Sequence, residues 1–118
     1  MATRAANAVL GQNREVTVTW EGLVGDADVG AAVAFPHLPI KTVQVLGTFG
    51  GGAPGVTMEG SNDGGTTWAT LHADDGGTLV FTAAGMEAIV ENPGLIRPDG
   101  HTGTGGDIDV IVVCVGDR

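Results

Sequence analysis

Polar and apolar residues alternate along several short segments of the chain. In residues 14–21, Val16, Val18 and Trp20 fall on one side, and the threonines between them fall on the other. A period of two residues is typical of a strand that buries one face. Similar segments, some of them weaker, recur further along the chain at residues 41–49, 55–61, 66–71, 78–82 and 87–91. The pattern therefore predicts a protein built from short strands.

The last segment, residues 107–115, differs from the others. Its second half, Val-Ile-Val-Val-Cys-Val, is apolar on both sides instead of alternating. Strands that are covered on both faces read in this way. We therefore expect residues 107–115 to form a central strand with both of its faces buried, and Cys114 within it to be a buried, unreactive thiol.

Glycine and turn-forming residues separate the predicted strands. The chain has 21 glycines, many of them in clusters such as residues 50–52 and 64–65, which favour turns and disfavour long helices. We expect residues 41–49 and 55–61 to pair as an antiparallel hairpin, and residues 55–61 to pair next with 66–71. Seven or eight short strands with such turns predict an all-β fold, a single-domain β-sandwich or jelly roll, without deciding between the two.

The first thirteen residues lack this alternation and predict an extended N-terminal arm, or a strand added to another protein, ahead of a β-sandwich domain at residues 14–118. The first fourteen residues contain Arg4 and Arg14 and no acid, whereas the rest holds three Lys or Arg against fourteen Asp or Glu. We expect Arg4 and Arg14 to pair with acidic surface on a partner. Exposed ion pairs are weak, so Ala8, Val9 and Leu10 should supply most of the contact.

Charge and hydropathy exclude several classes of partner. With only five basic residues and a formal charge of −9, the chain cannot assemble the cationic surface that nucleic acids require. We also expect no membrane contact, because every uncharged apolar run is far shorter than the roughly 20 residues of a membrane span. The N-terminal residues lack the apolar core of a signal peptide, which predicts synthesis in the cytoplasm.

The residue types needed for catalysis are scarce and scattered. The chain has one serine, one cysteine and three histidines, the latter at His37, His72 and His101 with no metal-binding spacing. Ser61 lies in a turn sequence, where its hydroxyl has a structural explanation. We therefore expect no enzymatic activity, no cofactor and no metal site. Three close acidic pairs read as solvated turn acids or, alternatively, as calcium ligands: Asp26/Asp28, Asp74/Asp75 and Asp107/Asp109.

Three segments of the chain carry a family resemblance: TVQVLGTFG at residues 42–50, VTMEGSNDGGTTW at 56–68 and ENPGLIRP at 91–98. Together they resemble the head decoration, or cement, proteins of tailed bacteriophages, with the likeness running over roughly residues 20–115. This resemblance implies a structural virion protein with a β-sandwich or jelly-roll body. It further implies a homotrimer that binds the major capsid protein on the outer surface of the capsid and stabilises the shell.

Two other functions remain open from the sequence. One is a different virion role, in the tail, neck or fibre. The other is a carbohydrate-binding module, in which Trp68 and the Asn62-Asp63 turn would face a sugar, because an aromatic platform beside acids is a common way to bind saccharides. The alternating position of Trp68 favours a place in the core, as for Trp20.

Overall fold

The fold was analysed in a computed structural model, which describes residues 3–11, 15–23, 28–35, 38–49, 55–100 and 106–116. These residues contain strands and turns and no helix, so the predicted all-β class is confirmed. The strands are Thr3–Arg4 (β1), Ala6–Leu10 (β2), Val16–Leu23 (β3), Val29–Gly30 (β4), Ile40–Thr48 (β5), Val56–Ser61 (β6), Ala69–Thr70 (β7), Val80–Phe81 (β8), Gly85–Ile89 (β9), Leu95–Gly100 (β10) and Asp107–Val115 (β11).

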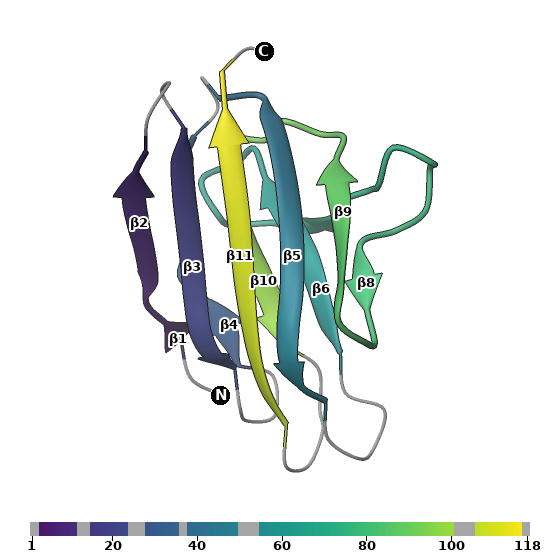
Figure 1. Cartoon of the computed structure of the whole chain (residues 1–118). Helices are drawn as coiled ribbons and strands as arrows, with labels where there is room; N and C mark the ends of the chain where they lie inside the picture. The colour runs from purple at the N-terminus through teal and green to yellow at the C-terminus, as the bar shows by residue number, and fades with distance from the viewer. Residues whose placement is uncertain are drawn as a thin grey trace.

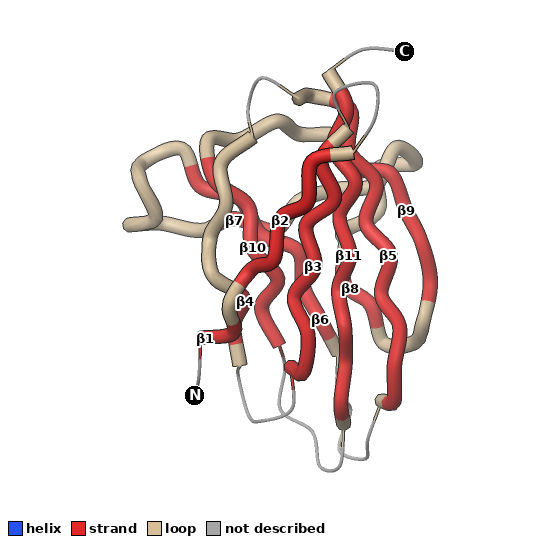
Figure 2. Tube along the Cα trace, turned by 60° about the vertical axis from the view of Figure 1, so that its left-hand side comes forward, coloured by secondary structure: helices blue, strands red, loops and turns tan. Residues whose placement is uncertain are grey.

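The strands form two packed sheets (Figures 1 and 2). One sheet has the order β2-β3-β11-β5-β9, and the other has the order β1-β4-β10-β6-β7 with β8 also paired to β6. From β3 onward, the chain passes from one sheet to the other at almost every connection. The layers β3-β11-β5-β9 and β4-β10-β6-β7 are those of a jelly roll, the closer description of the predicted sandwich.

The core lies between the two sheets and is built mainly from aliphatic side chains. Val18, Val43, Val110 and Val112 are fully buried, and Trp20 is the one large aromatic residue among the fully buried side chains of the described residues. The Trp20 indole Nε1 donates a hydrogen bond to the Ala31 carbonyl at 2.9 Å. The predicted burial of Trp20 is thus confirmed, as is that of Cys114.

The first predicted hairpin is wrong. β5 and β6 belong to different sheets: β5 pairs with β11 and β9, whereas β6 pairs with β10, β7 and β8. Alternation reports which face of a strand is buried, but it does not report which strand lies beside it. The second predicted hairpin is correct, because β6 and β7 pair antiparallel through Glu59 with Thr70 and Gly60 with Ala69.

One central strand, β10, has no counterpart among the predicted elements. Its sequence, Leu-Ile-Arg-Pro-Asp-Gly, contains the residues of a turn, yet it pairs with β6 over six positions. Pro98 has no N–H to donate. The ladder on the other side of β10 is short, with Asp99 opposite Val29 of β4, so few bonds are lost there.

The segment predicted as an arm takes part in both sheets. β1 pairs parallel with β4 in one sheet, and β2 pairs antiparallel with β3 in the other. In the described residues this segment is therefore an edge strand of the sandwich itself. Its addition to a partner protein, and the domain boundary after residue 13, stay predictions.

Candidate functional site

The partner-binding residues predicted at the N-terminus do not form one site. Arg4 is bonded inside the chain: its Nη2 and Nε lie 2.8 and 3.0 Å from Oδ2 of Asp28. Asp28 is only 3% exposed, which corrects its interpretation as a solvated turn acid. Arg4 thus compensates a buried carboxylate, because an unpaired charge there would be costly. Arg14 and Asp26 lie outside the described residues.

Ala8, Val9 and Leu10 lie on β2, at the edge of the five-stranded sheet. All three are exposed, Val9 at 57% and Leu10 at 75%. Exposed apolar residues on an edge strand are a common place for contact with another chain. Among the predicted partner-binding residues that the structure describes, Arg4 therefore belongs to an internal ion pair, whereas Ala8, Val9 and Leu10 form an exposed, mainly apolar edge on β2.

The outer face of the five-stranded sheet is free of charge over two complete rows of residues. One row follows the strand register from β2 to β9, and the second runs parallel to it two residues away. We call these ten residues the uncharged face: Asn7, Thr19, Ile111, Gln44 and Met86 in the first row, and Val9, Thr17, Val113, Thr42 and Ala88 in the second.

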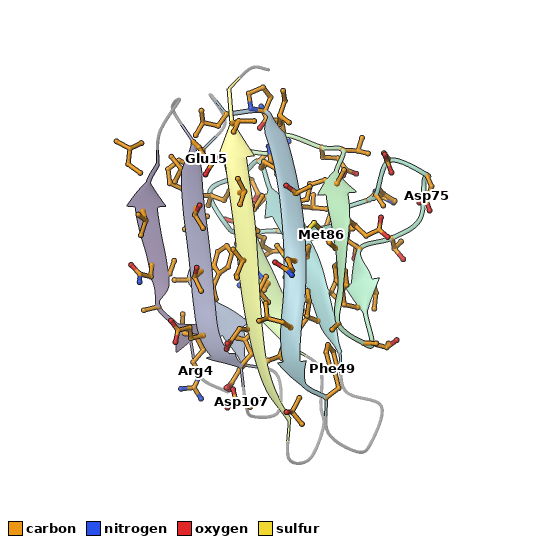
Figure 3. The ribbon with its side chains drawn as sticks, in the orientation of Figure 1. Arg4, Glu15, Phe49, Asp75, Met86 and Asp107 are labelled. Carbon is orange, nitrogen blue, oxygen red and sulfur yellow. The ribbon has the colours of Figure 1, made fainter. Side chains whose placement is uncertain are left out.

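Exposed apolar side chains occur within the uncharged face. Met86 is 58% exposed. Figure 3 shows Met86 on the sheet, while Glu15, Arg4 and Asp107 lie toward the ends of the strands. Asp109 stands in the neighbouring row, where its Oδ1 accepts a hydrogen bond from the Gly22 N–H at 3.0 Å. Such a patch on an acidic protein is a candidate interface.

The outer side of the six-stranded sheet has a different chemistry. Arg97 of β10 donates from Nε to Oε1 of Glu59 at 3.0 Å, and its guanidinium lies 4.0 Å from the ring centroid of Trp68. Burial raises the pKa of Glu59, and the bond from Arg97 only partly opposes this shift. Trp68 is half-buried and outside the core, so its predicted burial is wrong.

A tight turn connects β6 to β7 and holds Trp68 in place. The Ser61 hydroxyl donates to Oδ1 of Asp63 at 2.7 Å and accepts from the Gly65 N–H at 2.9 Å. Asp63 Oδ1 also accepts from the Thr67 N–H at 2.9 Å, and the Trp68 indole N–H bonds to the Gly65 carbonyl at 3.0 Å. Gly65 itself has φ 92°, a conformation that favours glycine.

An open cleft of about 470 Å³ lies between this turn and the segment that follows β9. The residues that line it include Gly60, Trp68, Leu71, Asn92 and Pro93. The volume falls in the range of small-molecule sites. The Asn92 side-chain oxygen accepts a hydrogen bond from Nζ of the buried Lys41 at 2.6 Å, which ties the wall to β5. Burial lowers the pKa of Lys41 from its ordinary value.

Glu91 and His72 form a pair at the rim of the cleft. Glu91 accepts from the backbone N–H of His72 at 2.8 Å, and its Oε2 lies 2.5 Å from His72 Nδ1. Although burial acts to raise it, the hydrogen bonds from His72 hold the pKa of Glu91 below its ordinary value. Ser61 and His72 therefore have separate partners, and the Ser61 hydroxyl shapes its turn, as its sequence context predicts.

The described ranges contain neither a metal-binding group nor a membrane-spanning helix. Within them, no three His, Cys, Asp or Glu side chains come together as a group that could hold a metal ion. The same residues contain no helix of the length and apolarity needed to cross a membrane. His37 and His101 lie outside them.

No protein-family model and no curated protein matches this chain. The candidate surfaces therefore rest on the geometry of this chain. Sequence reasoning identified Trp68 and the Asn62-Asp63 turn, but it missed Glu91, Asn92 and Arg97, which come from strands and loops about thirty residues further along. It also missed the uncharged face, because its ten members come from five strands that only the fold brings together.

Proposed function

We propose that this protein is a structural component of a bacteriophage virion, which attaches to the outer surface of the capsid and stabilises the shell. The uncharged face would be its contact surface for the major capsid protein. The main observation in support of this proposal comes from strand β11. Its inner side chains Val110 and Val112 are fully buried, but Ile111 and Val113 on its outer side are only partly covered by neighbouring side chains.

The sequence of β11 is that of a strand covered on both faces, yet the jelly roll covers only one of them. Central strands of sheets that face water normally place polar residues on the outer side. A partner that covers Ile111 and Val113 would account for the difference. Apolar area removed from water contributes about 25 cal/mol per Å², so this face has free energy to gain from contact.

The charge distribution favours the same surface. The chain carries a formal charge of −9, and most approaches to another protein would bury carboxylates. Burying an unpaired charge is costly, whereas threonine, valine and amide side chains can enter an interface without that cost. Through the uncharged face, this acidic molecule can thus contact a shell with little electrostatic repulsion.

Fold alone does not separate a virion protein from a lectin, since jelly rolls serve both. The resemblance of residues 42–50, 56–68 and 91–98 to phage decoration proteins favours the virion role. A homotrimer also fits this role. The two rows cover on the order of 300 Å² by strand spacing, well below the roughly 800 Å² that each partner contributes to a stable interface. Three linked copies would multiply a weak contact.

The test is co-sedimentation with capsid shells assembled from the major capsid protein that is encoded with this chain. Thr19→Lys places a charge in the middle of the uncharged face, and we expect it to weaken binding at least tenfold. Thr66→Lys makes the same substitution in the exposed β6–β7 turn, on the other side of the sandwich, and should bind as the unmodified protein does. Circular dichroism checks that both variants fold.

Equal binding by the Thr19→Lys and Thr66→Lys variants would exclude the uncharged face as the contact surface. A lack of binding by the unmodified protein to shells and to complete particles would remove the decoration role. Sedimentation velocity of the free protein tests the trimer separately.

A further inference from the structure

The cleft beside Trp68 is separate from the proposed contact surface for the capsid. It lies on the side of the six-stranded sheet, whereas the uncharged face is the outer side of the five-stranded sheet. Its walls come from the β6–β7 turn and from the segment between β9 and β10, which are far apart in sequence. A ligand could occupy this cleft while the uncharged face is covered.

The cleft is held in its shape by hydrogen bonds of the chain itself. Asp63 Oδ1 receives bonds from Ser61 and Thr67, and Ser61 in turn accepts from Gly65. Across the cleft, the Asn62 side-chain oxygen accepts from the Gly94 N–H at 2.9 Å, which links the two walls. A site that is ordered before binding loses less entropy when a ligand arrives.

Trp68 lines the cleft, and the face of its ring that Arg97 does not cover is a flat apolar surface. The Arg97 guanidinium stacks on the ring at 4.0 Å, and the indole N–H is bonded to Gly65, so the ring orientation is fixed. An aromatic ring left outside the core usually has a contact to make, because its large apolar area gains from burial. The C–H side of a pyranose ring is a flat apolar partner of suitable size.

The other groups that line the cleft form hydrogen bonds with hydroxyls. Thr70 offers a hydroxyl, which both donates and accepts, whereas the Thr67 hydroxyl donates to Asp63 and keeps only its acceptor side. Asn62 offers its amide nitrogen as a donor, since its oxygen bonds to Gly94. Asp63 and Glu91 offer carboxylate oxygens as acceptors. Donors and acceptors beside an aromatic surface match a polyhydroxylated ring better than an apolar or a singly charged ligand.

The carboxylates also determine which charge the ligand can carry. Backbone and side-chain hydrogen bonds from Thr67 and Ser61 lower the pKa of Asp63 to about 2, so this group is ionised at neutral pH. The pKa of Glu91 is also below its ordinary value. Two negative charges at the cleft disfavour anionic ligands and leave neutral hydroxyl groups as the preferred donors.

From these contacts we infer that the cleft beside Trp68 binds a neutral saccharide, with one sugar ring against the indole and its hydroxyls on Asn62, Thr70 and the turn. This second binding surface goes beyond the proposed attachment to the capsid. It would allow a capsid-bound copy to contact glycans from the outside of the particle. An affinity on the order of 1 mM is expected for a single sugar ring.

The test is saturation-transfer NMR and tryptophan fluorescence on the full chain. The probes are N-acetylglucosamine, methyl galactoside, methyl glucoside, methyl mannoside and a tetrasaccharide of each, with sialic acid as the anionic comparison. Trp20 is fully buried, so a change in emission on titration reports on Trp68. We expect at least one neutral sugar to bind, with sialic acid at least fivefold weaker.

Variants assign the binding to the cleft. Trp68→Ala and Thr70→Val should each weaken binding, the former at least tenfold and the latter about threefold. Met86→Ala, on the uncharged face, should leave it unchanged. Thr70→Val keeps the size and β-branching of the side chain, so it serves even if Trp68→Ala disturbs the turn. The inference is overturned if none of the neutral probes binds at 20 mM, if sialic acid binds best, or if both cleft variants bind as the unmodified protein does.

Discussion

The two outer faces of the sandwich follow the same strand geometry but have opposite chemistry. On the outer side of the six-stranded sheet, Arg97 bonds to Glu59 and stacks on Trp68. On the five-stranded side, the ten residues of the uncharged face, in two rows of five, carry no charge. Charged and aromatic side chains on the first face are held by one another, while the second presents short side chains in a continuous sheet.

This difference shows that packing of the core does not determine which residues lie on the outer side of a strand. Both sheets bury Val, Ile, Leu or Met on their inner faces, so the core requires the same of each. The outer residues Ile111 and Val113 of β11 are nevertheless apolar, although folding of the single chain leaves them partly exposed. This contrast is the reason why we propose two separate binding surfaces, one for a protein shell and one for a small polar ligand.

The largest change in stability is expected when each of the two tryptophans is replaced by alanine in turn. Trp20→Ala should destabilise the fold by about 4 kcal/mol, because it removes a fully buried ring and leaves a cavity in the core. Trp68→Ala should cost about 1 kcal/mol, since that ring is half-buried and its cation–π contact is near the surface. Urea unfolding followed by circular dichroism measures both. Similar losses in the two variants would contradict the placement of Trp68 outside the core.

A smaller effect is expected at the ion pair that fastens β1 to the six-stranded side. Arg4→Ala should destabilise the protein by about 2 kcal/mol, because Asp28 would keep a buried charge without its guanidinium partner. The double variant Arg4→Ala, Asp28→Ala should lose less than the sum of the two single variants. Strictly additive losses in a double-mutant cycle would show that the pair contributes no coupling.

The turn beside the cleft predicts a dependence of stability on pH. The pKa of Asp63 falls from 3.8 to about 2 on folding, because Thr67 and Ser61 bond to its charged form. The contribution of ionised Asp63 to the stability of the fold is therefore complete above pH 3.8 and is lost as the pH falls toward 2. In thermal melts between pH 5 and pH 2, Asp63→Asn should reduce the fall in melting temperature. An unchanged pH profile would exclude a role for Asp63 in this range.

The smallest effect on stability is expected on the uncharged face. Val113→Ala and Thr19→Lys should each change the free energy of unfolding by less than about 0.5 kcal/mol, because surface positions outside the core contribute little. The same Thr19→Lys variant should lose capsid binding. A loss of several kcal/mol in either variant would mean that these residues serve the fold, and it would remove the reason to assign them to a partner.

Much of the fold could be predicted because strand periodicity is local. The alternation at residues 14–21 and the apolar run at 107–115 correspond closely to β3 and β11, and the turn residues of 61–65 correctly predicted the β6–β7 hairpin. β10 was missed because Arg97, Pro98, Asp99 and Gly100 have the local propensity of a turn. Only pairing with β6 holds them extended.

The sequence by itself determined the all-β class, the burial of Trp20 and Cys114, and the role of the Ser61 hydroxyl. Each depends on neighbours within a few residues or on a repeating period. Tertiary structure alone decided that β5 and β6 lie in different sheets, that Arg4 meets Asp28, and that Trp68 lies outside the core beside a cleft. The Arg4–Asp28 pair, for example, joins residues that are 24 positions apart. Such long-range contacts depend on the packing of the whole sandwich, which no local pattern records.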